Sequence, residues 1–142
     1  MKIRVLVVDD EEEFVNSLAQ RLELRNFETL TAFEGNTALA LLRERDLDVI
    51  ILDVKMPGLD GIEVLREAKR FKPLVEVIML TGYATVPEAI EGMRLGAFDF
   101  LMKPTETEDL IAKIQNAHRR KAEQEERIRK AEINDILKRR GW

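Results

Sequence analysis

Short apolar runs alternate along the chain with longer segments in which apolar residues recur every three or four positions. The short runs predict β-strands and the longer segments predict amphipathic helices. The runs at residues 3–8 and 49–52 are almost continuously apolar, as expected of parallel strands buried on both faces. The five predicted strands are residues 3–8, 27–32, 49–52, 75–80 and 97–102. We therefore expect an α/β domain with a doubly wound, five-stranded parallel sheet.

Four helix starts are predicted from an oxygen-bearing side chain followed three residues later by Glu, the spacing of a capping box. These pairs are Asp10 with Glu13, Asp60 with Glu63, Thr85 with Glu88, and Thr105 with Glu108. In the first helix the apolar stripe runs through Val15, Leu18 and Leu22, and Phe14 falls at its edge. We therefore expect Phe14 to be partly exposed.

The segment from Thr105 onward contains neither Gly nor Pro before Gly141, which predicts one extended C-terminal helix. Its apolar register is regular only as far as Ala117, and residues 118–127 are almost wholly polar. We expect a globular domain over residues 1–118 and a helical extension over 119–142 that does not sustain a coiled-coil heptad. Three roles for the extension remain open: packing against the fourth helix, forming a homodimer, or presenting a docking surface.

A chain of 142 residues with 45% hydrophobic content can form one domain of ordinary size. The absence of Cys and the presence of a single His exclude disulfides, thiolate metal sites and multi-histidine zinc sites, and agree with a reducing cytoplasm. The apolar run at residues 3–8 is too short for a signal peptide, and no run is long enough to span a bilayer. We expect a cytoplasmic protein that does not enter membranes.

The net charge of −4 conceals two oppositely charged parts. Residues 1–114 contain 14 basic and 22 acidic residues, a net charge of −8, whereas residues 115–142 contain 9 basic and 5 acidic residues, a net charge of +4. The basic tail also contains Glu and has no interleaved aromatic residues. We therefore expect no direct binding of nucleic acid.

Acidic, hydroxyl and basic residues follow four of the predicted strands: Asp9 and Asp10, Asp53, Thr81 and Lys103. Parallel strands end at one edge of a sheet, so these side chains are predicted to converge there. Three close carboxylates repel one another unless they bind a proton, a base or a cation. Hard oxygen ligands favour Mg²⁺, with Asp10, Asp53 and a loop carbonyl near Lys55 as ligands and Asp9 as an anion behind them.

Such a site predicts phosphoryl chemistry. A carboxylate oxygen of Asp53 that is not bound to the metal can attack phosphorus, and Lys103 and the Thr81 hydroxyl can stabilise the phosphoryl oxygens. Taken singly, Asp10 could be a helix cap and Asp53 a turn residue. Caps and turns do not, however, require Asp10, Asp53, Thr81 and Lys103 together, so their joint placement favours a functional site.

Three segments resemble the receiver domain of bacterial two-component response regulators: Asp9-Asp10-Glu11, the stretch DVKMPGLDG around Asp53, and TGYATVPEAIEGMRLGAFDFLMKP from Thr81 to Pro104. The resemblance covers residues 1 to about 118. It implies a flavodoxin-like sheet with strand order 2-1-3-4-5 and a cis Lys103-Pro104 peptide. It also implies that Asp53 accepts a phosphoryl group with Mg²⁺ as cofactor, the chain catalysing only its own phosphorylation and dephosphorylation.

The resemblance further implies a sensor histidine kinase or phosphotransfer protein as donor and a downstream protein target. Thr81 and Phe100 correspond to the switch pair of the family, although many members have Tyr in place of Phe100. Lys55 and Tyr83 correspond to positions that line the approach of water to the phosphoryl group. Phe14, Pro57 and Tyr83 correspond to partner contacts.

We interpret the chain as a stand-alone receiver. One alternative is the input domain of a larger transcription regulator, because the stretch after Thr81 resembles receivers attached to ATPase activators of transcription. A second alternative is a Mg²⁺-dependent aspartyl phosphatase. Those enzymes usually carry an acid two residues after the nucleophile, whereas this chain has Lys55 there.

Overall fold

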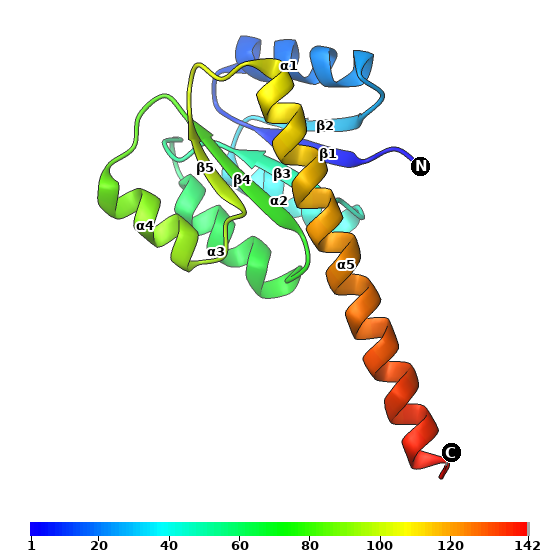
Figure 1. Cartoon of the computed structure of the whole chain (residues 1–142). Coiled ribbons are helices and arrows are strands. Elements are labelled where there is room, and N and C mark those ends of the chain that lie inside the picture. The colour runs from blue at the N-terminus through cyan, green and yellow to red at the C-terminus, as the bar shows by residue number, and fades with distance from the viewer. Residues whose placement is uncertain (142) are drawn as a thin grey trace.

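The computed structural model describes residues 1–141 as ten alternating strands and helices (Figure 1). The strands are β1 (Arg4–Val8), β2 (Glu28–Ala32), β3 (Val49–Leu52), β4 (Glu76–Thr81) and β5 (Asp99–Met102). The helices are α1 (Glu12–Leu24), α2 (Gly35–Glu44), α3 (Gly61–Phe71), α4 (Val86–Arg94) and α5 (Thr107–Arg139). All five predicted strands are present, with ends within two residues of those expected.

The strands form one parallel sheet with the order β2-β1-β3-β4-β5. This order confirms the predicted doubly wound, flavodoxin-like topology, and the Lys103-Pro104 peptide is cis as expected. None of the helices within residues 1–141 is long and apolar enough to cross a membrane.

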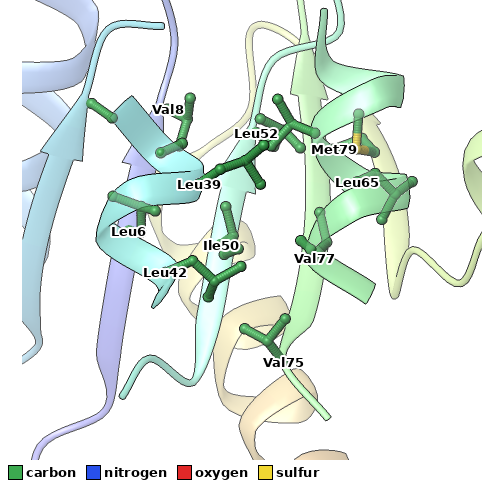
Figure 2. Close-up of a cluster of buried hydrophobic side chains, with 14 of the residues drawn as sticks. Leu6, Val8, Leu39, Leu42, Ile50, Leu52, Leu65, Val75, Val77 and Met79 are labelled. Atoms are coloured by element: carbon green, nitrogen blue, oxygen red, sulfur yellow. The ribbon is translucent and has the colours of Figure 1, made fainter. Parts of the chain in front are cut away.

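Alternate residues of the three central strands supply the cores on the two faces of the sheet. Leu6, Ile50 and Val77 point to one face, where they pack with the apolar stripes of α2 and α3 (Figure 2). Val5, Ile51 and Ile78 belong to the other core, which α1 and α5 cover. Burial on both faces explains why these strands are almost continuously apolar in sequence.

Two of the four predicted helix caps are wrong. Asp60 caps α3 and Thr85 caps α4 as expected, the latter in a complete capping box. Helix α1 begins after Glu11, and no side chain within residues 1–141 caps its first turn. Helix α5 begins after Glu106, one residue later than predicted and without a side-chain cap, and the Thr105 hydroxyl donates a hydrogen bond to the Met102 carbonyl.

Helix α5 continues without a break through the boundary predicted at residues 118 and 119, and its C-terminal half points away from the sheet (Figure 1). The extension therefore does not fold back over α4 in this structure. Its first turn is attached to the body, because the buried Lys121 lies 3.2 Å from Asp48 and Arg120 binds the buried Glu76. The division into residues 1–118 and 119–142 remains a prediction.

Candidate functional site

The predicted acidic residues meet at the carboxyl edge of the sheet. Asp9 and Asp10 follow β1, Asp53 follows β3, and the Asp53 amide donates a hydrogen bond of 3.0 Å to the Val8 carbonyl. This bond holds the two strand ends side by side. One carboxylate oxygen from each of the three Asp residues lies within 4.8 Å of the others. Asp9 and Asp53 are buried, whereas Asp10 is exposed.

The Asp53 carboxylate is not fully compensated by its surroundings. Within residues 1–141, its Oδ1 is the one buried side-chain oxygen or nitrogen that has no hydrogen-bond partner. Burial raises the pKa of Asp53, and the Asp9 charge adds to this effect, while the nearby Thr81 hydroxyl and Lys103 ammonium act in the opposite direction. Burial and the Asp9 charge also raise the pKa of Asp10, although its own backbone amide opposes them. The cluster therefore carries an excess of negative charge.

A glycine at the start of α3 allows the helix to approach the Asp53 backbone. The Gly61 amide donates a hydrogen bond of 2.9 Å to the Val54 carbonyl. A Cβ atom at Gly61 would lie only 2.0 Å from the Asp53 carbonyl oxygen, closer than van der Waals contact permits. Gly61 thus fixes the distance between α3 and the loop that carries Asp53.

Lys103 comes from the residue after β5 and reaches back across the edge of the sheet. Its Nζ lies 2.6 Å from Asp9 Oδ2 and 3.2 Å from Glu11 Oε1, and 4.0 Å from the centre of the Phe14 ring. Burial alone would lower the pKa of Lys103, but the hydrogen bond and charge of Asp9, together with Glu11, raise it. Lys103 is therefore a cation paired with Asp9, and its attraction to Asp53 is a smaller effect.

Thr81 is the last residue of β4, so this strand ends one residue later than the predicted end at residue 80. Its buried hydroxyl donates a hydrogen bond of 3.0 Å to the Tyr83 carbonyl, so it faces the loop between β4 and α4. The same hydroxyl also opposes the rise in the pKa of Asp53 that burial causes. Thr81 thus connects the acidic cluster to the loop that leads into α4.

The remaining predicted residues lie around this cluster. Phe100 is only partly buried, and a Cβ atom at Gly92 of α4 would lie 3.4 Å from its ring. Pro57 and Tyr83 are exposed, the latter to 66%. Phe14 is partly exposed as predicted, with its ring beside Lys103. The three expected partner contacts are therefore all accessible at this edge of the molecule.

Two residues that shape the site, Glu11 and Gly61, were not assigned a specific role from the sequence. Glu11 is a second anion for Lys103. The sequence shows Glu11 beside Asp9 and Asp10, but it does not show that Glu11 pairs with Lys103, which lies 92 positions away. Gly61 directly follows the helix cap Asp60, a place where many residues are acceptable, so only the close approach of the Asp53 backbone explains it.

The donor set fits a hard divalent cation. Three carboxylates meet at one point, two of them buried, and a buried Asp53 oxygen has no protein partner. Oxygen ligands of this kind are preferred by Mg²⁺ and Ca²⁺ rather than by softer metals. The acidic cluster could therefore hold a metal ion.

Comparison with known proteins agrees with this fold. The sequence profile described as the response regulator receiver domain matches residues 5–115. The regulatory protein AtoC of Escherichia coli K12 is 40% identical over 114 residues, which are 80% of this chain and 25% of AtoC. The CheY-like receiver domain protein of Methanospirillum hungatei is similar in structure, with a TM-score of 0.85 and 29% identity over 87% of this chain and 99% of that chain.

The structure of NtrX from Brucella abortus is also similar, with a TM-score of 0.82 and 34% identity over 89% of this chain and 29% of that chain. The chain thus spans about a quarter of the length of AtoC and more than a quarter of NtrX. Because the family profile covers most of the sequence, this chain belongs to the response regulator receiver domain family. It is a receiver domain of the two-component type.

Proposed function

We propose that this receiver domain accepts a phosphoryl group on Asp53 in a Mg²⁺-dependent reaction and signals through a change in conformation. The observation that carries the proposal is the buried Asp53 Oδ1, which has no protein partner and lies beside two other carboxylates. A buried, unpaired acceptor is destabilising unless a ligand completes it. Here a cation and a phosphoryl group would do so.

Asp10, Asp53 and the Lys55 carbonyl are the proposed metal ligands, with Asp9 behind them. When bound, Mg²⁺ would supply positive charge that offsets the repulsion between the carboxylates and an incoming phosphoryl group. Asp9 is already hydrogen-bonded, because its Oδ1 accepts from the Glu11 amide at 3.0 Å and its Oδ2 binds Lys103. This supports a role in orienting Lys103 rather than direct coordination.

In the proposed reaction one Asp53 oxygen forms a bond to phosphorus while phosphorus loses its bond to the donor. The electron pair of the broken bond leaves with the donor group, which is a histidine nitrogen of a kinase or phosphotransfer protein, or the acyl oxygen of acetyl phosphate. No base is needed, because the carboxylate is already ionised. Lys103 and the Thr81 hydroxyl would stabilise the transferred oxygens. The domain acts on itself and not on a separate substrate.

The proposed switch joins Thr81 to Phe100. A phosphoryl group adds about −1.5 to −2 units of charge at the site and would draw the Thr81 hydroxyl away from the Tyr83 carbonyl. The partly buried ring of Phe100 lies against Gly92 of α4, so movement of this ring would alter the α4 surface. The output is then a contact with a downstream protein target.

The proposed donors are a sensor histidine kinase or a phosphotransfer protein in the cytoplasm. Phe14, Pro57 and Tyr83 are the proposed contacts. Phe14 lines a groove of about 280 Å³ between α1 and the start of α5, next to Lys103 and Pro104. An apolar groove adjoining the acceptor site supports docking of a partner helix there.

Mass spectrometry after incubation with acetyl phosphate and Mg²⁺ tests the proposal. We expect the wild type to gain the mass of one phosphoryl group, and we expect Asp53→Asn, or wild type in EDTA, to gain none. Asp46→Asn is the matched control, because Asp46 is an exposed acid outside the cluster. A mass gain that persists in Asp53→Asn would remove Asp53 from this role.

A second candidate is the input domain of a larger transcription regulator. The match to a quarter of the regulatory protein AtoC favours this reading. The proposed phosphorylation of Asp53 is the same for a stand-alone domain and for an input domain. The two readings differ only in the downstream partner, which is a separate protein in the first and another domain of the same chain in the second. Determination of the full reading frame distinguishes them. The family match favours a receiver over an aspartyl phosphatase, and turnover of a phosphomonoester would contradict that assignment.

A further inference from the structure

Helix α4 is held to the body by few buried side chains. Only Gly92 is buried among the residues of α4, all of which the structure describes, whereas α1, α2 and α3 each bury four residues. Its apolar residues Val86, Ile90 and Met93 are 73%, 53% and 46% exposed. A helix with so few buried side chains can separate from the body at a low cost in free energy. Polar contacts at its ends therefore contribute much of what holds α4 in place.

One side chain at the start of α4 completes the helix cap and also reaches the acceptor loop. Glu88 Oε1 accepts hydrogen bonds from the Thr85 amide at 2.8 Å and from the Thr85 hydroxyl at 3.1 Å. Glu88 Oε2 accepts from Lys55 Nζ at 2.6 Å. Lys55 lies two residues after Asp53. The cap of α4 is therefore tied to the loop that carries the proposed phosphoacceptor.

The loop between β4 and α4 is bonded at both ends. At one end the Thr81 hydroxyl donates to the Tyr83 carbonyl, and at the other Thr85 and Lys55 share the Glu88 carboxylate. Only residues 82–85 lie between β4 and α4. A loop this short transmits a change at either end to the first turn of α4.

We propose that the ion pair between Lys55 and Glu88 is a latch that holds the first turn of α4 against the acceptor loop, and that a phosphoryl group on Asp53 releases the latch by competing for the Lys55 ammonium. This rests on the proposed function. Lys55 and Glu88 are positioning residues in this scheme.

The direction of release follows from charge and reach. A phosphoryl group carries about −1.5 to −2 units of charge, against −1 for the Glu88 carboxylate. A lysine ammonium is a point charge on a flexible stem and can exchange one oxygen partner for another. The hydrogen bond between the two side chains raises the pKa of Lys55 and lowers that of Glu88, so both are charged at neutral pH. Loss of Lys55 leaves Glu88 bonded only within its own helix cap.

Amide hydrogen exchange at the start of α4 tests the latch in the unphosphorylated protein. The amides to follow are those of Glu88, Ala89 and Ile90. We expect Lys55→Met and Glu88→Gln each to speed their exchange roughly two- to five-fold, the range for loss of an exposed ion pair. Glu88→Gln retains an oxygen for the capping box, so it removes the ion pair without removing the cap. The double variant should exchange no faster than either single variant.

A matched control separates the latch from a general effect of charge on α4. Glu91 lies on the same helix and pairs with Arg66 of α3 at 3.5 Å, outside the capping box. We expect Glu91→Gln to leave exchange at Glu88, Ala89 and Ile90 unchanged. Equal acceleration in Glu91→Gln and Glu88→Gln, or additive effects in the double variant, would contradict the latch.

Loading with acetyl phosphate and Mg²⁺ tests the release. We expect phosphorylated wild type to exchange these amides as fast as unphosphorylated Glu88→Gln, and we expect loading to cause no further increase in Glu88→Gln. A phosphorylated protein that keeps full protection at these amides overturns the release alone. A protein that takes up no phosphoryl group on Asp53 overturns the proposed function and the release with it.

Discussion

Acidic side chains are buried both at the amino edge of the sheet, where the strands begin, and at the carboxyl edge, where the strands end. The two edges differ in how far nearby bases compensate these charges. At the amino edge, the buried Asp48 lies 3.2 Å from Lys121, and the buried Glu76 accepts hydrogen bonds from Arg120 and lies 3.8 Å from Lys69. Each acid is matched by at least one base from a helix. These pairs tie α3 and α5 to the starts of the strands.

At the carboxyl edge the acidic side chains are only partly compensated. Three carboxylates gather there, and Lys103 bonds to Asp9 and Glu11 instead of Asp53. Asp53 Oδ1 has no partner, and burial raises the pKa of Asp53. The paired charges at the amino edge therefore stabilise the fold. The unpaired Asp53 carboxylate at the carboxyl edge destabilises it and leaves a site that a ligand can complete.

The largest expected effect comes from breaking a pair at the amino edge. We expect Lys121→Met to lower the free energy of unfolding by about 3 kcal/mol, because it removes the nearest cation of the buried Asp48 carboxylate and leaves it only the Arg4 amide at 2.8 Å and the Arg4 guanidinium at 3.9 Å. Urea denaturation measures this change. In the double variant with Asp48→Asn the loss should be smaller than in Lys121→Met alone. A loss below about 1 kcal/mol in the single variant would show that the two edges do not differ as we describe.

Binding of Mg²⁺ at the carboxyl edge should raise the free energy of unfolding by slightly less than Lys121→Met lowers it. We expect Mg²⁺ at 100 times its dissociation constant to raise the free energy of unfolding by about 2.7 kcal/mol, because the ion binds only the folded state. Thermal unfolding in Mg²⁺ and in EDTA, at equal ionic strength, measures it. Lys121→Met should retain the full Mg²⁺ effect and Asp53→Asn should lose most of it. Equal stabilisation of both variants would argue against the acidic cluster as the binding site.

Removing the uncompensated charge should stabilise the metal-free protein. We expect Asp53→Asn in EDTA at neutral pH to raise the free energy of unfolding by roughly 1–2 kcal/mol, since a neutral amide replaces a buried, unpaired negative charge beside two other carboxylates. Asp46→Asn, at an exposed position near the amino edge, should leave stability almost unchanged. A loss of stability in Asp53→Asn would mean that Asp53 is compensated after all.

The difference in stability between Asp53→Asn and wild type should depend on pH. The pKa of Asp53 is raised above its ordinary value of 3.8, so its ionisation disfavours the folded state as the pH rises through the folded-state pKa. We therefore expect the stability gap between Asp53→Asn and wild type to be largest at neutral pH and to narrow as the pH falls towards 4. Urea titrations at several pH values in EDTA measure the gap, and a gap that widens on acidification would contradict the assigned direction.

The smallest effect is expected in the exposed part of α5. Arg129 pairs with Glu126 at 2.6 Å, but both side chains are exposed and both lie on the same helix. We expect Arg129→Gln to leave the urea midpoint unchanged, because solvent screens such pairs. A shift comparable to that of Lys121→Met would indicate that the extension is packed against a partner in solution.

The strands and two of the four helix caps could be predicted from the sequence, whereas the starts of α1 and α5 could not. The caps at Asp60 and Thr85 were predicted correctly from spacing alone. The same spacing failed at Asp10, which lies in the acidic cluster, and at Thr105, whose hydroxyl binds the end of β5. The capping pattern does not settle the outcome, because a side-chain hydroxyl can bond to another backbone group nearby, as Thr105 does with the Met102 carbonyl.

The sequence by itself determined the strands, the buried face of the first helix and the set of polar residues at the strand ends. These features depend on periods of two and of about 3.6 residues, which are readable from neighbouring positions. Only the tertiary structure decided which charges meet. Lys103 pairs with Asp9 across 94 residues, Arg120 with Glu76 across 44, and Lys55 with Glu88 across 33. No local period encodes such pairs, because they depend on where the packed elements bring distant side chains together.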